Sequence, residues 1–278
     1  MDLTFKGAAR RLDDLDLPKL GALIGVGEDE IHAFLDVETS GHGFDAQGRP
    51  IVLFEPHVFY RNLSGAARAQ AVAAGLAYPR WGERPYPRDS YPRLKAAVAI
   101  DETAALRSAS WGLGQVLGEN HTAAGFATVQ VMVEAMKADE KLQLLAAVNF
   151  IKTNRLDDNL RNHDWAGFAK GYNGSGYRKN AYDTKLANAY RKWSRIKDTP
   201  WSSSAKASED RPAPVPPPVA AAKPVPASPP LRPVTPPASA PAPTPAAKPG
   251  PAAEYVERNR LWRLILAGVG AIFSWKGK

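Results

Sequence analysis

The chain has 278 residues, no cysteine and a formal net charge of +8 at pH 7. The absence of cysteine excludes disulfides, thiolate catalysis and cysteine-ligated metal sites. Residues 201–278 hold 10 Lys and Arg against 4 Asp and Glu, so +6 of the charge belongs to that part and only +2 to residues 1–200. Because the first 200 residues are nearly neutral and have no stripe of basic side chains, we expect no nucleic-acid partner.

An acidic residue interrupts the apolar face of an amphipathic segment at residues 30–41. Ile31, Phe34 and Leu35 follow the i, i+3, i+4 spacing of a buried helix face. The next position on that face is Glu38. A carboxyl group on the core side loses hydration, which raises its pKa and suits a general acid. The alternative is a helix-end glutamate whose carboxylate turns back to water.

A turn and a short strand follow this predicted helix. Residues 40–43 are poor helix formers with two glycines, so the helix is expected to end there. Residues 45–50 predict a turn, and the apolar residues 51–54 predict a buried strand of a hairpin. That strand leads to a second carboxylate, Glu55. One acid after a helix and another after a hairpin is an arrangement suited to glycoside hydrolysis.

The rest of the first 200 residues has the apolar spacing and alanine content of helices. The predicted helical segments are 64–77, 91–108, 125–153 with a break at Asp139, 156–170 and 181–196. Residues 78–87 form an aromatic, proline-broken loop, for which we favour surface packing over sugar stacking. The fold class expected from these patterns is mainly α with a small β-hairpin.

Two glycine-rich stretches, residues 108–120 and 168–177, are candidate walls of a binding cleft. Small residues allow close approach of a ligand to the backbone, and amides such as Gln115 or Asn120 supply hydrogen bonds. Each stretch alone is equally typical of a helix cap or a tight turn. The five histidines lack the spacing of a metal site and no GxSxG elbow occurs, so we expect no metal, cofactor or Ser-His-Asp chemistry.

Four motifs in order carry a family resemblance. They are Val37-Glu38-Thr39-Ser40-Gly41, Leu53-Phe54-Glu55-Pro56-His57-Val58-Phe59, Ser110-Trp111-Gly112-Leu113-Gly114-Gln115 and Tyr172-Asn173-Gly174. Together they resemble the N-acetylmuramidase domain of phage and bacterial endolysins, a family similar to goose-type lysozymes and lytic transglycosylases. The resemblance covers about residues 10–195 and implies an α+β lysozyme-like fold, with the hairpin beside the active site. Thr39 stands where many relatives have serine.

The resemblance implies cleavage of the β-1,4 bond between N-acetylmuramic acid and N-acetylglucosamine in peptidoglycan glycan strands. Glu38 takes the place of the catalytic acid. Glu55 is the candidate second carboxylate, with a structural role in the hairpin as its alternative, and Asp45 is a weaker candidate. The residues expected to line the saccharide groove are Gln115, Tyr172 and Asn173 by resemblance, with Asn120 added from its glycine-rich surroundings.

Two other functions stay open. If no carboxylate activates water, the 6-hydroxyl of the substrate can attack instead and leave an anhydro sugar, as in the transglycosylase relatives. The chain could also be a non-catalytic peptidoglycan-binding module whose activity lies in its C-terminal tail.

A change in composition sets the domain boundaries at residues 1–200, 201–253 and 254–278. The middle part holds most of the prolines, 17 of 25 between Pro212 and Pro251, and is expected to be a disordered, extended linker. The last part is a basic, apolar segment with Trp262 and Trp275 near its ends, too short to span a bilayer as a helix. It suits an amphipathic helix at an anionic membrane or envelope, with docking on a protein as the alternative.

The N-terminus has no apolar signal-peptide core. We therefore expect a protein that is made in the cytoplasm without a classical signal peptide. The resemblance implies action in the periplasm or cell wall, with membrane association through the C-terminus as a further expectation. We also expect a monomer.

Overall fold

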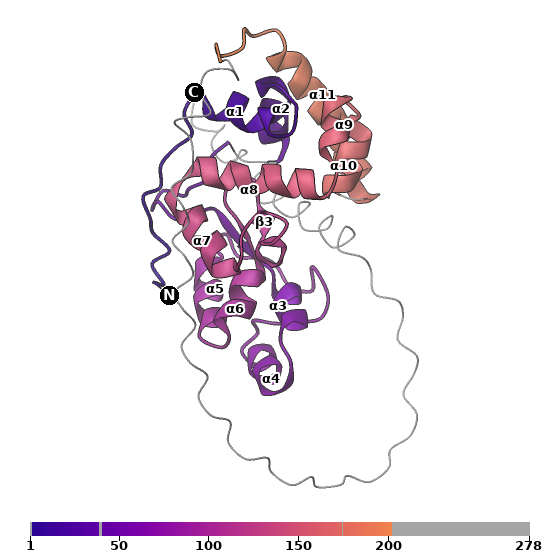
Figure 1. The fold of residues 1–278 in the computed structure, drawn as a ribbon. Coiled ribbons are helices and arrows are strands. Elements are labelled where there is room, and N and C mark those ends of the chain that lie inside the picture. Colours follow the sequence, from indigo (N-terminus) through magenta and orange to yellow (C-terminus); the bar gives the residue numbers. More distant parts are fainter. Residues whose placement is uncertain (1, 39–40, 174, 202–278) are drawn as a thin grey trace, which may run out of the picture. The chain divides into compact units, whose positions relative to one another are not determined.

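The computed structural model describes residues 2–38, 41–173 and 175–201 (Figure 1). The side chains of Glu38 and Asn173 lie outside this described part, as do the predicted linker and C-terminal helix. Within it the chain forms eleven α-helices, two short 3-10 helices and one three-stranded sheet. The prediction of a mainly α fold with a small β element is confirmed. None of the described helices is long and apolar enough to cross a membrane.

Most of the helices lie within the segments that the sequence predicts to be helical. The helices are α1 (Asp16–Ala22), α2 (Glu28–Glu38), α3 (Pro56–Asn62), α4 (Gly65–Ala73), α5 (Tyr91–Val98), α6 (Glu102–Arg107), α7 (Val129–Ala138), α8 (Glu140–Thr153), α9 (Asp157–Arg161), α10 (Trp165–Asn173) and α11 (Tyr182–Trp193), with 3-10 turns η1 (Gly118–Asn120) and η2 (Ser175–Asn180). The sequence did not indicate α1 or α3.

The breaks between helices have local causes. The predicted break at Asp139 is confirmed, because Asp139 is extended and its side chain accepts a hydrogen bond from the Lys141 N–H as the N-cap of α8. Asp101 caps α6 in the same way, which divides residues 91–108 into two helices. Residues 156–170 are also divided, since His163 has a left-handed backbone with φ of 53° between α9 and α10.

The sheet joins segments far apart in the chain. Strand β1 (Val52–Phe54) pairs antiparallel with β2 (Ala109–Trp111), and β2 pairs with β3 (Val116–Leu117). The predicted buried strand is therefore present, but its partner is β2 and not the segment before the 45–50 turn. That segment keeps a single bridge between Phe44 and Pro50. All residues of β1 are buried, so their backbone N–H and carbonyl groups need hydrogen-bond partners inside the core. Strand β2, which is also buried, supplies these partners.

Helix α8 forms the centre of the apolar core. Figure 1 shows it between α1, α2 and α9 to α11 on one side and α5 to α7 on the other. Leu144, Ala147 and Ile151 of α8 have no exposed surface. A helix buried on most of its circumference orients the elements that pack on it.

Helix α2, which ends at Glu38, is held along its length. Glu30 accepts a hydrogen bond from the Gly27 N–H at 2.9 Å and lies 2.7 Å from Nε2 of His163. Further along, His32 stacks on Trp193 of α11 with ring centroids 3.8 Å apart. These contacts hold α2 in place and thereby set the backbone position of its last residue, Glu38.

The acidic start of α2 predicts a pH-dependent stability. Burial, followed by the nearby charges of Asp198, Glu30 and Glu28, raises the pKa of Asp29 to about 6. Because the pKa of Asp29 is higher in the folded state than in the unfolded state, the free energy of unfolding decreases as the pH rises from about 4 through about 6. Asp29→Asn should therefore raise the midpoint of thermal unfolding at neutral pH, and the gain should vanish near pH 4.

Thermal unfolding followed across this pH range checks the prediction. Asp14→Asn, at an exposed aspartate, is the matched control and should not change the pH profile. A less stable Asp29→Asn protein at neutral pH would contradict the prediction.

Candidate active site

The predicted apolar face of α2 is present, and Glu38 is the last residue of the helix. Ile31 and Phe34 have no exposed surface and Val37 is buried, whereas Leu35 is only half-buried. The backbone thus places Glu38 one turn beyond a buried face. Whether its carboxyl group is itself buried stays a prediction.

The loop after Glu38 is tied to α8 by hydrogen bonds on both sides of Gly43. The Gly43 N–H donates to Oε1 of Glu140 at 2.7 Å, and its carbonyl accepts from the Ile51 N–H at 2.8 Å. Oε1 of Glu140 also pairs with Arg11 at 2.6 Å. A buried carboxylate with these two donors is well satisfied, so it holds the chain at Gly43 against α8.

Gln143, one turn further along α8, lies between this loop and the glycine-rich stretch at residues 108–120. Its Oε1 accepts from the Leu113 N–H at 2.7 Å, and its Nε2 donates to the carbonyls of Met136 at 2.8 Å and Gly43 at 3.4 Å. The side chain has only 1% of its surface exposed. Gln143 was not among the residues that the sequence indicated, because nothing in its helical surroundings distinguishes a buried amide from an exposed one.

The Gly112-Leu113-Gly114-Gln115 motif is the turn between β2 and β3. Gly112 and Gln115 both have a left-handed backbone, with φ of 66° and 48°. Nε2 of Gln115 donates to the carbonyl of Gly112 at 2.7 Å and to that of Ile51 at 3.2 Å. The buried amide therefore holds the turn against β1. Its predicted contact with a saccharide stays a prediction.

Tyr172 connects the last motif to this turn. Its ring has no exposed surface, stacks with Phe168 at a centroid distance of 5.4 Å and meets Phe34 edge-on at 5.2 Å. Its hydroxyl donates to the carbonyl of Gly114 at 3.1 Å. Two motifs 58 residues apart thus meet through one hydrogen bond. Tyr172 supports the glycine turn from the core side.

The other two predicted groove residues differ in what the structure shows. Asn173 follows Tyr172 at the end of α10, and its side chain lies outside the described residues. Asn120 is half-buried at the end of η1, where its carbonyl accepts from the Ala124 N–H at 2.9 Å. Because η1 packs on α6 and α7, Asn120 is separated by β3 from the Gly112–Gln115 turn.

Glu55 is a fully buried acid at the end of β1. Its N–H donates to the Ser108 carbonyl at 2.8 Å, which continues the pairing of β1 with β2. Its Oε2 accepts from the Tyr86 hydroxyl at 2.8 Å and lies 3.5 Å from Nδ1 of His57. The aromatic loop at residues 78–87 thus packs against the sheet. The sequence indicated this loop but did not connect Tyr86 to Glu55.

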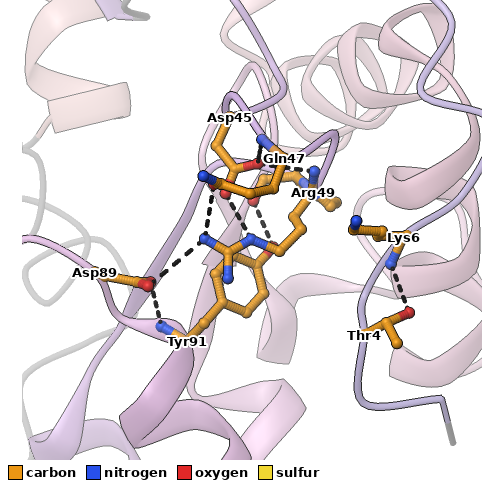
Figure 2. Close-up of polar contacts among 8 residues, drawn as sticks. Thr4, Lys6, Asp45, Gln47, Arg49, Asp89 and Tyr91 are labelled. Atoms are coloured by element: carbon orange, nitrogen blue, oxygen red, sulfur yellow. Dashed lines mark hydrogen bonds and ion pairs between the residues drawn. The ribbon is translucent and has the colours of Figure 1, made fainter.

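Asp45 has a structural role in its own turn. Its Oδ1 accepts from the N–H groups of Gln47 and Arg49, each at 2.9 Å, and its Oδ2 accepts from Nε of Arg49 at 2.7 Å. Figure 2 shows this turn, with the Arg49 guanidinium over the ring of Tyr91 and near Asp89. An aspartate with three donors at a turn is the normal turn-forming arrangement, so we assign Asp45 no part in catalysis.

In the described part of the chain, no cluster of three or more His, Asp or Glu residues is arranged to hold a metal ion.

Comparison with known proteins decides the family. Residues 28–194, which span all four motifs, match the family model described as N-acetylmuramidase. The chain belongs to this family. The muramidase domain is also similar to a solved structure titled as that of the Burkholderia AP3 phage endolysin, with 36% sequence identity and a TM-score of 0.63. That match covers 67% of this chain and 73% of the other. No curated protein matches.

The resemblance inferred from the motifs is thereby confirmed. As a member of the N-acetylmuramidase family, the protein is a glycoside hydrolase that acts on peptidoglycan.

Substitution of two glycines of the muramidase should destabilise the fold for two different reasons, a steric clash with Gln143 at Gly43 and backbone strain at Gly41. A Cβ at Gly43 would lie 1.9 Å from Oε1 of Gln143, whereas a Cβ at Gly41 would have nothing within 4 Å but a φ of 82°. Gly43→Ala should destabilise the fold by about 2 to 3 kcal/mol through overpacking. Gly41→Ala should cost about 1 kcal/mol through backbone strain alone.

Chemical denaturation of both variants measures the two effects. Equal losses, or a larger loss for Gly41→Ala, would show that Gln143 does not hold Gly43 as the structure indicates.

Proposed function

We propose that this chain is an endolysin-type muramidase that hydrolyses the β-1,4 bond between N-acetylmuramic acid and N-acetylglucosamine. The observation that carries the proposal is the family match over residues 28–194, because it contains Glu38, Glu55 and both glycine-rich motifs. The similarity to a phage endolysin supports a role in lysis, with action at the cell wall.

Glu38 is the proposed general acid. It ends a helix that is held by α11 and by the Glu30–His163 contact, and it precedes a loop that is bonded to α8. An acid must lie within hydrogen-bond reach of the glycosidic oxygen, so the firm packing of α2 supports this role. Protonation of the leaving oxygen by Glu38 breaks the bond to the sugar.

Glu55 is the proposed second carboxylate. It would position the attacking water or stabilise the positive charge on the oxocarbenium-like transition state. Its position at the end of a strand in the sheet that also carries the Gly112–Gln115 turn supports the proposal. Without this role, attack by the 6-hydroxyl of the substrate would give an anhydro product, which is the transglycosylase alternative.

Glu38→Gln tests the proposed function. The amide keeps the size of the side chain but carries no transferable proton, so turnover should fall by at least about a thousandfold while folding and wall binding persist. Wild type and variant are incubated with peptidoglycan sacculi, and the released products are identified by reducing-end assay and mass spectrometry.

The products separate the alternatives. New reducing N-acetylmuramic acid ends from wild type alone support the hydrolase, and anhydro ends support the transglycosylase. Binding to sacculi without release of products would favour the non-catalytic module, and full activity of Glu38→Gln would refute the assigned acid.

We further propose that residues 254–278 contact an anionic membrane or envelope. The proposal is supported by the sequence alone, in which five Lys and Arg flank or interrupt an apolar stretch with Trp262 and Trp275. A basic segment of this kind gains binding energy from both apolar burial and attraction to acidic lipids.

A peptide of residues 254–278 should bind anionic vesicles and release a trapped dye, and it should bind neutral vesicles much less. A variant peptide with Trp262→Ala and Trp275→Ala is the matched control and should bind more weakly. Neither binding nor release at anionic vesicles would leave protein docking as the better explanation of the segment.

A further inference from the structure

We infer that Tyr86 is the positioning residue that holds Glu55 ionised and correctly oriented for the muramidase reaction. The inference rests on the proposed function, since it concerns the second carboxylate of the same site. It assigns a role to the aromatic loop at residues 78–87, which lies outside all four motifs.

The geometry at Glu55 differs from that of a structural helix cap. Glu55 occupies the N-cap position of α3, but its side chain makes no capping hydrogen bond to that helix. Its carbonyl receives the N–H groups of Val58 and Phe59 at 3.0 Å, so the cap is formed by the backbone alone. The carboxylate instead has its Oε2 2.8 Å from the hydroxyl of Tyr86. A fully buried carboxylate needs such a donor to offset its lost hydration, so Tyr86 is placed to control the state of Glu55.

Tyr86 acts as the donor of this hydrogen bond. Burial, together with the charge of Glu55, raises the pKa of Tyr86 well above its usual value. The phenol therefore keeps its proton over the whole working pH range. A donor to a carboxylate stabilises the ionised form of that carboxylate, which opposes the effect of burial.

His57, Arg93 and Tyr78 also lie in the surroundings of the Glu55–Tyr86 pair. His57 from α3 has its Nδ1 3.5 Å from Oε2, and Arg93 from α5 interacts electrostatically with Tyr86. Tyr78 is buried in the same cluster, and its pKa is raised by burial in spite of the nearby Arg93. An anionic Glu55 suits water positioning or charge stabilisation, whereas the acid of the pair has to carry a proton.

The backbone conformation of Tyr86 is restricted by its neighbours in the loop. Tyr86 lies between Pro85 and Pro87, and a residue before proline is confined to extended conformations. The carbonyl of Pro85 also accepts a hydrogen bond from Arg93 at 3.5 Å. Because little backbone freedom is left to lose, the hydroxyl is preorganised toward Glu55.

Tyr86→Phe removes only the hydroxyl and tests the inference. We expect kcat on solubilised peptidoglycan fragments to fall about tenfold or more with little change in KM, since a hydrogen bond to a charged group is lost. The acidic limb of the pH profile of kcat should move to higher pH, because Glu55 would then ionise less readily. A merely structural tyrosine would not shift that limb.

Tyr91→Phe is the matched control. It removes the hydroxyl of a buried tyrosine, which donates to the Pro50 carbonyl at 2.6 Å and not to Glu55. This control should lower thermal stability and leave the pH profile of kcat unchanged. Thermal unfolding of Tyr86→Phe confirms that the assayed protein is folded.

A double-mutant cycle completes the test. In a Glu55→Gln background, Tyr86→Phe should have little further effect, because the charge that it stabilises is gone. A wild-type pH profile for Tyr86→Phe, or an equal loss in both backgrounds, would overturn the inference. Full activity of Glu55→Gln would also overturn it and would leave the muramidase function intact, whereas only the Glu38→Gln result bears on that function.

Discussion

The position of the candidate site depends on two buried polar side chains of one helix. Glu140 and Gln143 lie one turn apart on α8 and bind main-chain groups of Gly43 and Leu113, which belong to loops 97 and 30 residues away. An unpaired polar group in the core is costly, so all of these hydrogen bonds must form together. The loop after Glu38 and the turn before Gln115 are consequently fixed to the same helix.

This constraint explains why the motifs consist of small residues and amides. The glycines leave room for Gln143, whose Oε1 would clash with a Cβ at Gly43 and lie 2.8 Å from one at Gly112. Gln115 and Tyr172 then hold the turn by bonding to backbone carbonyls. The described residues of the motifs therefore form a framework for the site. A framework built on a helix and a sheet is stiffer than one built on loops alone.

The two candidate acids lie on different elements of the fold. Glu38 is the last residue of α2, whereas Glu55 is buried at the end of β1, where it accepts a hydrogen bond from the hydroxyl of Tyr86. A pair that acts as acid and anion requires two carboxyl groups with unlike protonation states. In the proposed pair, the aromatic loop contributes to this difference from outside the four motifs.

By itself, the sequence determined the mainly α fold, the end of α2 near Glu38 and the helix break at Asp139, because periodicity and helix termination are local properties of a few residues. It also determined the family, because four ordered motifs are specific in combination. Only the tertiary structure decided that β1 pairs with β2, that Gln143 joins two loops and that Tyr86 binds Glu55. Each of these contacts joins residues at least 30 positions apart. Their partners are chosen by which buried groups must satisfy one another in the core, and no local pattern records that choice.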